Sequence, residues 1–340
     1  MMTLKTREGD LIETLEGLIF DVKGLVHPQD RVVAFIRYFR EARGDRVRNG
    51  LSYGKVYSLS NRYALLKQNY PQYLVLDPVF DERMCEVPIN CLKEIYDPIA
   101  KLQQLEKGES MDALESKALN LGLLLGEKAG IRRNSIGISG SILVGLHRAN
   151  SDLDLIVYGS ANCRKVNITL RKMLNDPDSA LRPYDSSDLK RLFDFRSKDT
   201  AMCFEDFVRT ESRKAFQGKF MDTDYFIRFV KDWYEIDEKY GDFQYKNLGC
   251  AKIKATVSDD SESILTPCSY SIENTTVTEG LKNVPITKIC SFRGRFCEQA
   301  RKGEAVMARG KVEKVMDTRT DRSHFRLLIG SHPTDNMILV

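Results

Sequence analysis

One stretch of the chain constrains its fold more than any other. Residues 137–160 read GISGSILVGLHRANSDLDLIVYGS. The pattern predicts a short strand, a Gly-Ser turn, a short apolar helix, a polar loop and a second apolar strand. Asp152 and Asp154 begin the second strand and lie two positions apart, so both point to the same face. Because two carboxylates on one face repel each other and resist burial, the pair indicates a functional site.

A divalent cation would relieve this repulsion. Carboxylate oxygens are the ligands that Mg²⁺ prefers, and one or two carboxylates plus substrate phosphates are its usual ligands in enzymes. Gly140 allows the backbone to approach a ligand closely, and Ser141 is expected to open a helix whose free N–H groups attract phosphate. Together these residues predict a site for a nucleoside triphosphate with Mg²⁺ or Mn²⁺.

Length and composition set limits on the rest of the protein. A chain of 340 residues is too long for one ordinary core, and 42% hydrophobic with 29% charged residues is typical of a soluble globular protein. The net charge of +4 permits an anionic partner without requiring one. The eight cysteines include no C-x-x-C pair, so no zinc ribbon is expected. No apolar run approaches the roughly 20 residues that span a bilayer, and we expect a cytoplasmic protein that does not bind a membrane.

The pattern of the chain predicts an α+β protein of three domains. Residues 1–105 alternate β-like runs with turns and indicate a small α+β domain. Residues 106–235 form the second domain, which opens with one helix over 106–130 and closes with one long strand over 218–233. Residues 240–340 are rich in β-branched residues, Gly and Ser, which predicts a small β-barrel or sandwich.

The Gly-Ser turn followed ten residues later by Asp-x-Asp resembles the nucleotidyltransferase superfamily typified by DNA polymerase beta. The resemblance covers roughly residues 106–230, and the whole chain looks similar to uncharacterised archaeal proteins of that superfamily. It implies a central domain in which helices flank a short mixed sheet. It also implies transfer of a nucleoside monophosphate from a triphosphate, with ATP as the expected donor, and release of pyrophosphate. The acceptor stays open, with RNA and protein as candidates.

The resemblance also implies roles for single residues. Ser139, Gly140 and Ser141 match the turn that grips the phosphates of the nucleotide. Asp152 and Asp154 match the first two metal ligands of the family.

Further residues complete the expected site. Arg148, in the loop before the second strand, is a candidate for contacting the triphosphate. Active members of the superfamily usually have a third carboxylate on a later strand, and Asp222 and Asp224 are the candidates here. Both are expected to share one face of the strand over 218–233, and Asp224 is favoured as a metal ligand because it adjoins the aromatic and apolar run.

Two other kinds of protein fit the same sequence. One is a catalytically silent, nucleotide-binding regulatory protein. The other is an RNA-binding module in which the C-terminal domain carries the function. Residues 286–315 hold eight Lys or Arg against three Glu, and Phe292 and Phe296 flank Arg293 and Arg295. Basic and stacking side chains of this kind suit single-stranded nucleic acid, although the alternation of the two rings equally fits the core face of a strand.

Overall fold

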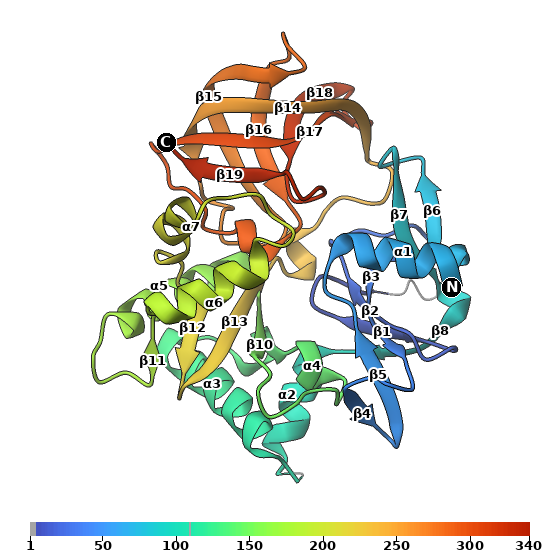
Figure 1. Cartoon of the computed structure of the whole chain (residues 1–340), viewed down its shortest axis with the longest axis vertical. Coiled ribbons are helices and arrows are strands. Elements are labelled where there is room, and N and C mark those ends of the chain that lie inside the picture. Colours follow the sequence, from blue (N-terminus) through green and yellow to red (C-terminus); the bar gives the residue numbers. More distant parts are fainter. Residues whose placement is uncertain (1–4, 109) are drawn as a thin grey trace. The chain divides into compact units, whose positions relative to one another are not determined.

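The structure is a computed structural model, and it describes residues 5–108 and 110–340. Within these residues, seven α-helices accompany three β-sheets of eight, five and six strands (Figure 1). The expected α+β class is therefore confirmed. None of the helices in the described residues is long and apolar enough to cross a membrane.

The chain folds into two compact units, and each is assembled from separate stretches of sequence. The first contains residues up to Val75, Cys85–Pro183 and Ala215–Ile236, and the second contains Leu76–Met84, Tyr184–Lys214 and Asp237–Val340. Residues 184–214 thus group with the C-terminal strands. The three expected domain ranges, 1–105, 106–235 and 240–340, stay predictions.

Most of the eight-stranded sheet lies in the first unit. Its main path runs β4-β5-β3-β2-β1-β8, with β7 on β3 and β6 on β7. The elements are β1 (Leu11–Thr14), β2 (Ile19–Val22), β3 (Arg31–Arg40), β4 (Arg46–Arg48), β5 (Leu51–Lys55), α1 (Leu59–Asn69), β6 (Leu74–Asp77), β7 (Glu82–Pro88) and β8 (Leu92–Tyr96). In β3, the alternating Val32, Ala34 and Ile36 are buried, as expected of a strand with one face in the core. Leu66 of α1 packs into the same core.

The sequence predicts one helix over 106–130, but the helix found in that range begins only at Ala113, and a separate helix ends at Glu106. The two helices are α2 (Pro98–Glu106) and α3 (Ala113–Ala129). Gly108, with a φ of +79°, interrupts the helical path. Asp112 then caps the start of α3 and forms a capping box with Glu115. The expected C-terminal cap at Gly130 is confirmed, with left-handed backbone geometry that favours glycine.

The second sheet of the first unit is mixed, with the order β11-β12-β13-β10-β9. Its elements, with those between them, are β9 (Ile136–Ile138), α4 (Gly140–Leu143), β10 (Leu153–Tyr158), α5 (Ser160–Leu174), β11 (Leu181–Arg182), β12 (Gln217–Phe220) and β13 (Thr223–Val230). β10 is antiparallel to β9 and parallel to β13. α3 and α5 contact each other and β10, and Leu155 lies beside Gly122 of α3. Asp154 and Ile156 alternate with Leu155 and therefore point to the other face.

The end of this sheet corrects the expectation of one long strand over 218–233. The chain turns at Met221 and Asp222, whose φ angles are +47° and +62°. Phe220 and Thr223 pair across this two-residue turn, which is the arrangement of a tight β-hairpin. Neither turn residue is the Gly or Asn that usually marks such a hairpin in a sequence, so the pattern did not reveal it.

The C-terminal part of the second unit is a β-barrel. Its strands are β14 (Phe243–Asp259), β15 (Cys268–Gly280), β16 (Ile286–Ser291), β17 (Ala305–Asp317), β18 (Arg322–Leu328) and β19 (Asn336–Leu339). They pair in the order β14-β15-β16-β18-β17, and the pairing of β14 with β17 closes the ring. β16 and β18 are parallel, and β19 adds to β17. This is the connectivity of the five-stranded OB-fold barrel, so the barrel, of the two expected alternatives, is what the structure contains.

Two helices from the middle of the chain belong to the same unit as the barrel. They are α6 (Ser186–Arg196) and α7 (Phe204–Glu211). α7 contacts β19 (Figure 1), and the N–H of Ala201 donates to the carbonyl of Pro333 at 2.9 Å. These contacts join two stretches that are more than a hundred residues apart in the sequence.

Candidate functional site

The turn between β9 and β10 lies directly against the carboxylate of Asp154. The N–H of Ser139 donates to the backbone carbonyl of Asp154 at 2.8 Å, and its hydroxyl donates to the carbonyl of Gly9 at 2.7 Å. Gly140 has a φ of +63°, and a Cβ added there would lie 1.9 Å from Oδ2 of Asp154. Because no side chain fits in that space, the approach of the turn to the carboxylate requires glycine.

Ser141 follows this glycine and has an unsatisfied hydroxyl. The residue is 2% exposed, and its Oγ has no hydrogen-bond partner in the described residues. A buried hydroxyl without a partner costs free energy, and such groups usually find one in a ligand or water. The helix that Ser141 was expected to open, α4, is a single turn of four residues. A helix this short offers little dipole for a phosphate, so the expectation that Ser141 opens a phosphate-binding helix stays a prediction.

Asp152 and Asp154 stand at the start of β10 without partners for their carboxylates. Asp152 is exposed and Asp154 is half-buried. Neither side chain makes a hydrogen bond or an ion pair with any part of the chain that the structure describes. Burial, with the neighbouring Asp152 as a further cause, raises the pKa of Asp154 to about 7. A positively charged ligand at this position would favour the ionised carboxylate and so oppose that shift.

The eight-stranded sheet contributes two cations to this site. Arg37 of β3 lines the same pocket as Ser139, Gly140 and Asp154. Lys55, at the end of β5, lies opposite Tyr38 of β3. Burial and the nearby Arg37 lower the pKa of Lys55 to about 8, and the two aspartates oppose this effect.

Sequence reasoning missed both residues. The only available signal was a lone arginine inside the apolar run RVVAFIRYF, where a charge needs a partner.

A third side of the pocket is lined by charges that are already paired. Arg228 of β13 donates to Glu8 at 2.8 Å and lies 3.5 Å from Asp21. Lys23 contacts the same two carboxylates at 2.9 and 3.0 Å. Burial acts to raise the pKa of Asp21, but Lys23, Arg228 and Arg37 outweigh it and hold the pKa well below its ordinary value. Asp21 is therefore a paired anion, unlike Asp154.

The two candidates for a third carboxylate lie in different settings. Asp224 is on β13, two residues before Phe226, which pairs with Asp154 in parallel register. Asp224 thus shares the sheet face of Asp154, and Lys219 holds it at 2.9 Å. Asp222 does not share that face, because it lies in the hairpin turn, where its side chain is 91% exposed and 3.7 Å from Arg182. The expectation that both residues line one strand face is therefore wrong for Asp222.

The charged residues of the loop before β10 have partners outside the pocket of Asp154. Arg148 donates to Asp45 at 2.5 Å, and Arg148 is not among the residues that line the pocket of Asp154. His147 is hydrogen-bonded to Asp112 at 2.6 Å, and these two lie with Glu115 in a group of potential metal ligands. Both acidic residues already form the capping box of α3. The loop residues therefore have structural partners.

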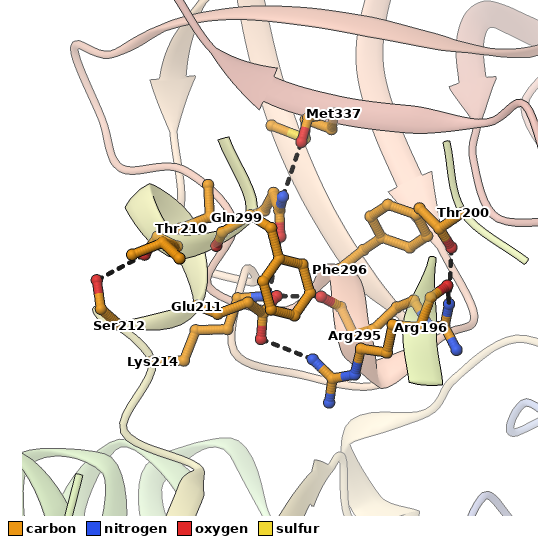
Figure 2. Close-up of polar contacts among 12 residues, drawn as sticks. Arg196, Thr200, Thr210, Glu211, Ser212, Lys214, Arg295, Phe296, Gln299 and Met337 are labelled. Atoms are coloured by element: carbon orange, nitrogen blue, oxygen red, sulfur yellow. Dashed lines mark hydrogen bonds and ion pairs between the residues drawn. The ribbon is translucent and has the colours of Figure 1, made fainter. Parts of the chain in front are cut away.

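Part of the basic segment over residues 286–315 in the C-terminal domain is also engaged in ion pairs. Arg293 and Arg295 both pair with Asp199, at 2.8 and 2.5 Å. Phe296 is 1% exposed and belongs to the core, near Arg295 as Figure 2 shows. Lys311 contacts Glu82 and Glu313. Phe296 and these cations are therefore part of the framework of the second unit and are not presented to a nucleic acid.

Comparisons with known proteins identify a relative of this chain. No family model matches the chain, and no solved structure matches it. A protein of Methanocaldococcus jannaschii, the uncharacterized protein MJ1086, is 34% identical over 337 residues, which cover 96% of each chain. At that identity and coverage, the present chain belongs to the same family as MJ1086.

Proposed function

We propose that this protein is a metal-dependent nucleotidyltransferase that transfers a nucleoside monophosphate from a triphosphate, with ATP as the expected donor, to an acceptor. The observation that carries the proposal is the contact between Gly140 and the carboxylate of Asp154. It puts a phosphate-binding type of turn beside an Asp-x-Asp pair, in the strand, turn, helix and strand order of the polymerase-beta-like superfamily. The parallel pairing of β10 with β13 also supports a polymerase-beta-like domain.

The donor set fits Mg²⁺ or Mn²⁺. Asp152 and Asp154 offer carboxylate oxygens that have no partner in the described residues, and the absence of a side chain at Gly140 lets the carboxylate of Asp154 lie directly against the turn. These two residues would hold the metal. A bound divalent cation would neutralise charge on the phosphates and on the attacking and leaving oxygens.

The chain's own groups would position the substrates. The hydroxyl of Ser141 would donate to a phosphate oxygen of the nucleotide, which satisfies its missing hydrogen bond. The acceptor oxygen would form a bond to the α-phosphorus and lose its proton to solvent, while the bond between the α-phosphorus and the bridging oxygen breaks and pyrophosphate leaves with that oxygen. Asp224 is the proposed third carboxylate, because it shares the face of Asp154; Lys219 pairs with it in the absence of ligands.

The test is incubation of the pure protein with each α-³²P-labelled nucleoside triphosphate and Mg²⁺ or Mn²⁺, first alone and then with RNA. We expect label on the protein itself or on the RNA, and release of pyrophosphate. The Asp152→Asn, Asp154→Asn double variant should lose metal-dependent ATP binding in calorimetry and lower transfer by at least about a hundredfold. Unchanged metal-dependent ATP binding in the double variant would remove the assignment.

The hairpin supplies a matched pair of variants for the third carboxylate. Asp224→Asn should abolish transfer while ATP affinity changes little, whereas Asp222→Asn, in the exposed turn, should leave both unchanged. The pairing of Asp224 with Lys219 also favours a second candidate function, a silent nucleotide-binding regulator with one free acidic pair. Wild-type protein that binds ATP with a metal, but transfers nothing to itself or to RNA, would support that candidate.

A further inference from the structure

Four charged side chains meet around β10 without forming a single ion pair among themselves. Arg37 and Lys55 are half-buried, as is Asp154, and Asp152 is exposed. In residues 5–108 and 110–340, neither cation has an acidic partner within 4.0 Å. The electrostatic influence of both aspartates nevertheless reaches both cations. The opposite charges are therefore more than 4.0 Å apart, and Arg37 and Asp154 line the same pocket.

Half-buried charges that stay apart are costly, since each loses hydration without gaining a partner. The cost is recovered when a ligand supplies the missing partners. The carboxylates call for a cation, and Arg37 and Lys55 call for an anion. A phosphate group with a divalent metal satisfies both at once, because the metal bridges carboxylate and phosphate oxygens. Arginine also presents a planar fork that suits phosphate, and lysine adds a point charge.

We infer that Arg37 and Lys55 form a phosphate-binding pair, so that the N-terminal sheet contributes directly to the site around Asp154. This inference rests on the proposed function only for the identity of the ligand. Two sources of phosphate have the required chemistry: the polyphosphate of the nucleotide and a phosphate group on the acceptor. The ammonium nitrogen of Lys55 lies 5.9 Å and 5.1 Å from the ring centres of Tyr38 and Tyr57, and these rings help to position it.

The first arm of the test uses inorganic tripolyphosphate and ATP, each with Mg²⁺, in isothermal titration calorimetry. Arg37→Gln and Lys55→Gln should each lower affinity by about tenfold or more, the usual loss for one charge-assisted hydrogen bond. Arg40→Gln, on the exposed end of the same strand, and Lys67→Gln, on the exposed face of α1, are the matched controls and should bind as wild type. Thermal melts establish that each variant is folded.

The second arm titrates inorganic phosphate into protein saturated with ATP and Mg²⁺. If the pair serves the nucleotide, the first arm shows the loss and no phosphate binds in the second. If the pair serves the acceptor, ATP affinity is unchanged and phosphate binding to the saturated protein depends on Arg37 and Lys55. The inference is wrong if Arg37→Gln and Lys55→Gln bind tripolyphosphate, ATP and inorganic phosphate as tightly as the wild type does. It is also wrong if the wild-type protein binds none of these anions.

The two proposals fail separately. If tripolyphosphate binding depends on Arg37 and Lys55 but no nucleotidyl transfer occurs, the phosphate-binding pair is supported and the enzyme proposal is wrong. If Arg37→Gln and Lys55→Gln both keep nucleotidyl transfer and wild-type affinity for the phosphate ligands, the enzyme proposal stands and the phosphate-binding pair is wrong.

Discussion

The charges around Glu211 in the second unit and those around Asp154 in the first differ in how they are paired. Glu211 accepts hydrogen bonds from Arg196 and Lys214, both at 2.6 Å (Figure 2). Lys214 is fully buried and also donates to Gln299 at 2.8 Å. Asp154 has no such partner for its carboxylate within the described residues. The group around Glu211 is buried and the group around Asp154 is partly buried, but only the first has its charges satisfied by the protein itself.

The difference separates two uses of charge. A network such as that of Glu211 is closed, because each buried ion is neutralised within the fold, and it serves to hold α6, α7 and the barrel together within the second unit. The group around Asp154 is open, since carboxylates and cations are positioned but not joined. An open group of this kind is a better sign of a ligand site than charge or burial alone.

The largest effect is expected where a closed network is broken. Glu211→Gln removes the anion shared by Arg196 and Lys214 and leaves two cations uncompensated. We expect a loss of about 3–5 kcal/mol in the free energy of unfolding, measured by urea denaturation. The exposed pair of Lys190 and Asp194 is the control, and Asp194→Asn should cost less than about 1 kcal/mol. Equal effects of the two variants would contradict the closed network.

A smaller effect is expected at the glycine beside Asp154. Gly140→Ala combines a strained backbone with a side chain that collides with the carboxylate, and we expect a loss of about 1–3 kcal/mol. Gly130→Ala is the matched control, because Gly130 has a similar φ of +60° but nothing within 4 Å of an added Cβ. Gly140→Ala should also lower metal-dependent ATP binding in calorimetry, and Gly130→Ala should not. If both variants bind ATP equally, the turn does not form part of the site.

The last comparison concerns the pH dependence of stability, whose slope is at most about 1.4 kcal/mol per pH unit for one group. The folded pKa of Asp154 is raised by burial and Asp152 to about 7. Between its unfolded pKa, about 4, and pH 7, the folded state keeps a proton that the unfolded state has lost. The stability of the wild type should therefore fall with rising pH relative to Asp154→Asn, and level off above pH 7.

For Asp199, the pH dependence of stability should have the opposite sign to that of Asp154. Burial acts to raise the pKa of its carboxyl, but Arg295 and Arg293 outweigh it and lower the pKa. The stability that Asp199 contributes is present above its unfolded pKa, about 4, and is lost as pH falls through the folded pKa. Asp199→Asn should therefore lower stability at neutral pH, and the deficit should shrink in acid. Denaturation curves at several pH values test both variants, and slopes of the same sign would contradict the comparison.

Local signals in the sequence were sufficient for part of the fold and of the site. The apolar run of β10, the Gly-Ser turn and the aspartate pair all lie within 24 residues, as the stretch 137–160 shows. The cap of α3 at Gly130 is equally local. Such features depend on backbone geometry and on the period of the side chains, which neighbours in the chain determine.

Other features depended on signals that the sequence did not display. The hairpin at Met221 and Asp222 uses residues that do not mark a turn, so Asp222 was placed on the wrong element. Phe296 alternates with Phe292 in a way that fits both a core face and a binding face, and only burial distinguishes the two. The basic segment over residues 286–315 had the same ambiguity, because the sequence does not show whether a cation has an acidic partner from a distant part of the chain.

The sequence by itself therefore determined the α+β class, the β character of the C-terminal part and the aspartate pair that draws attention to β10. Only the tertiary structure decided which cations reach that pair, since Arg37 and Lys55 lie about a hundred residues earlier and arrive through the pairing of β3 with β5. It also decided that β14 and β17 close the barrel and that α6 and α7 join it. The physical reason is that strand register and burial arise between distant segments, while turns, caps and alternation arise between neighbours.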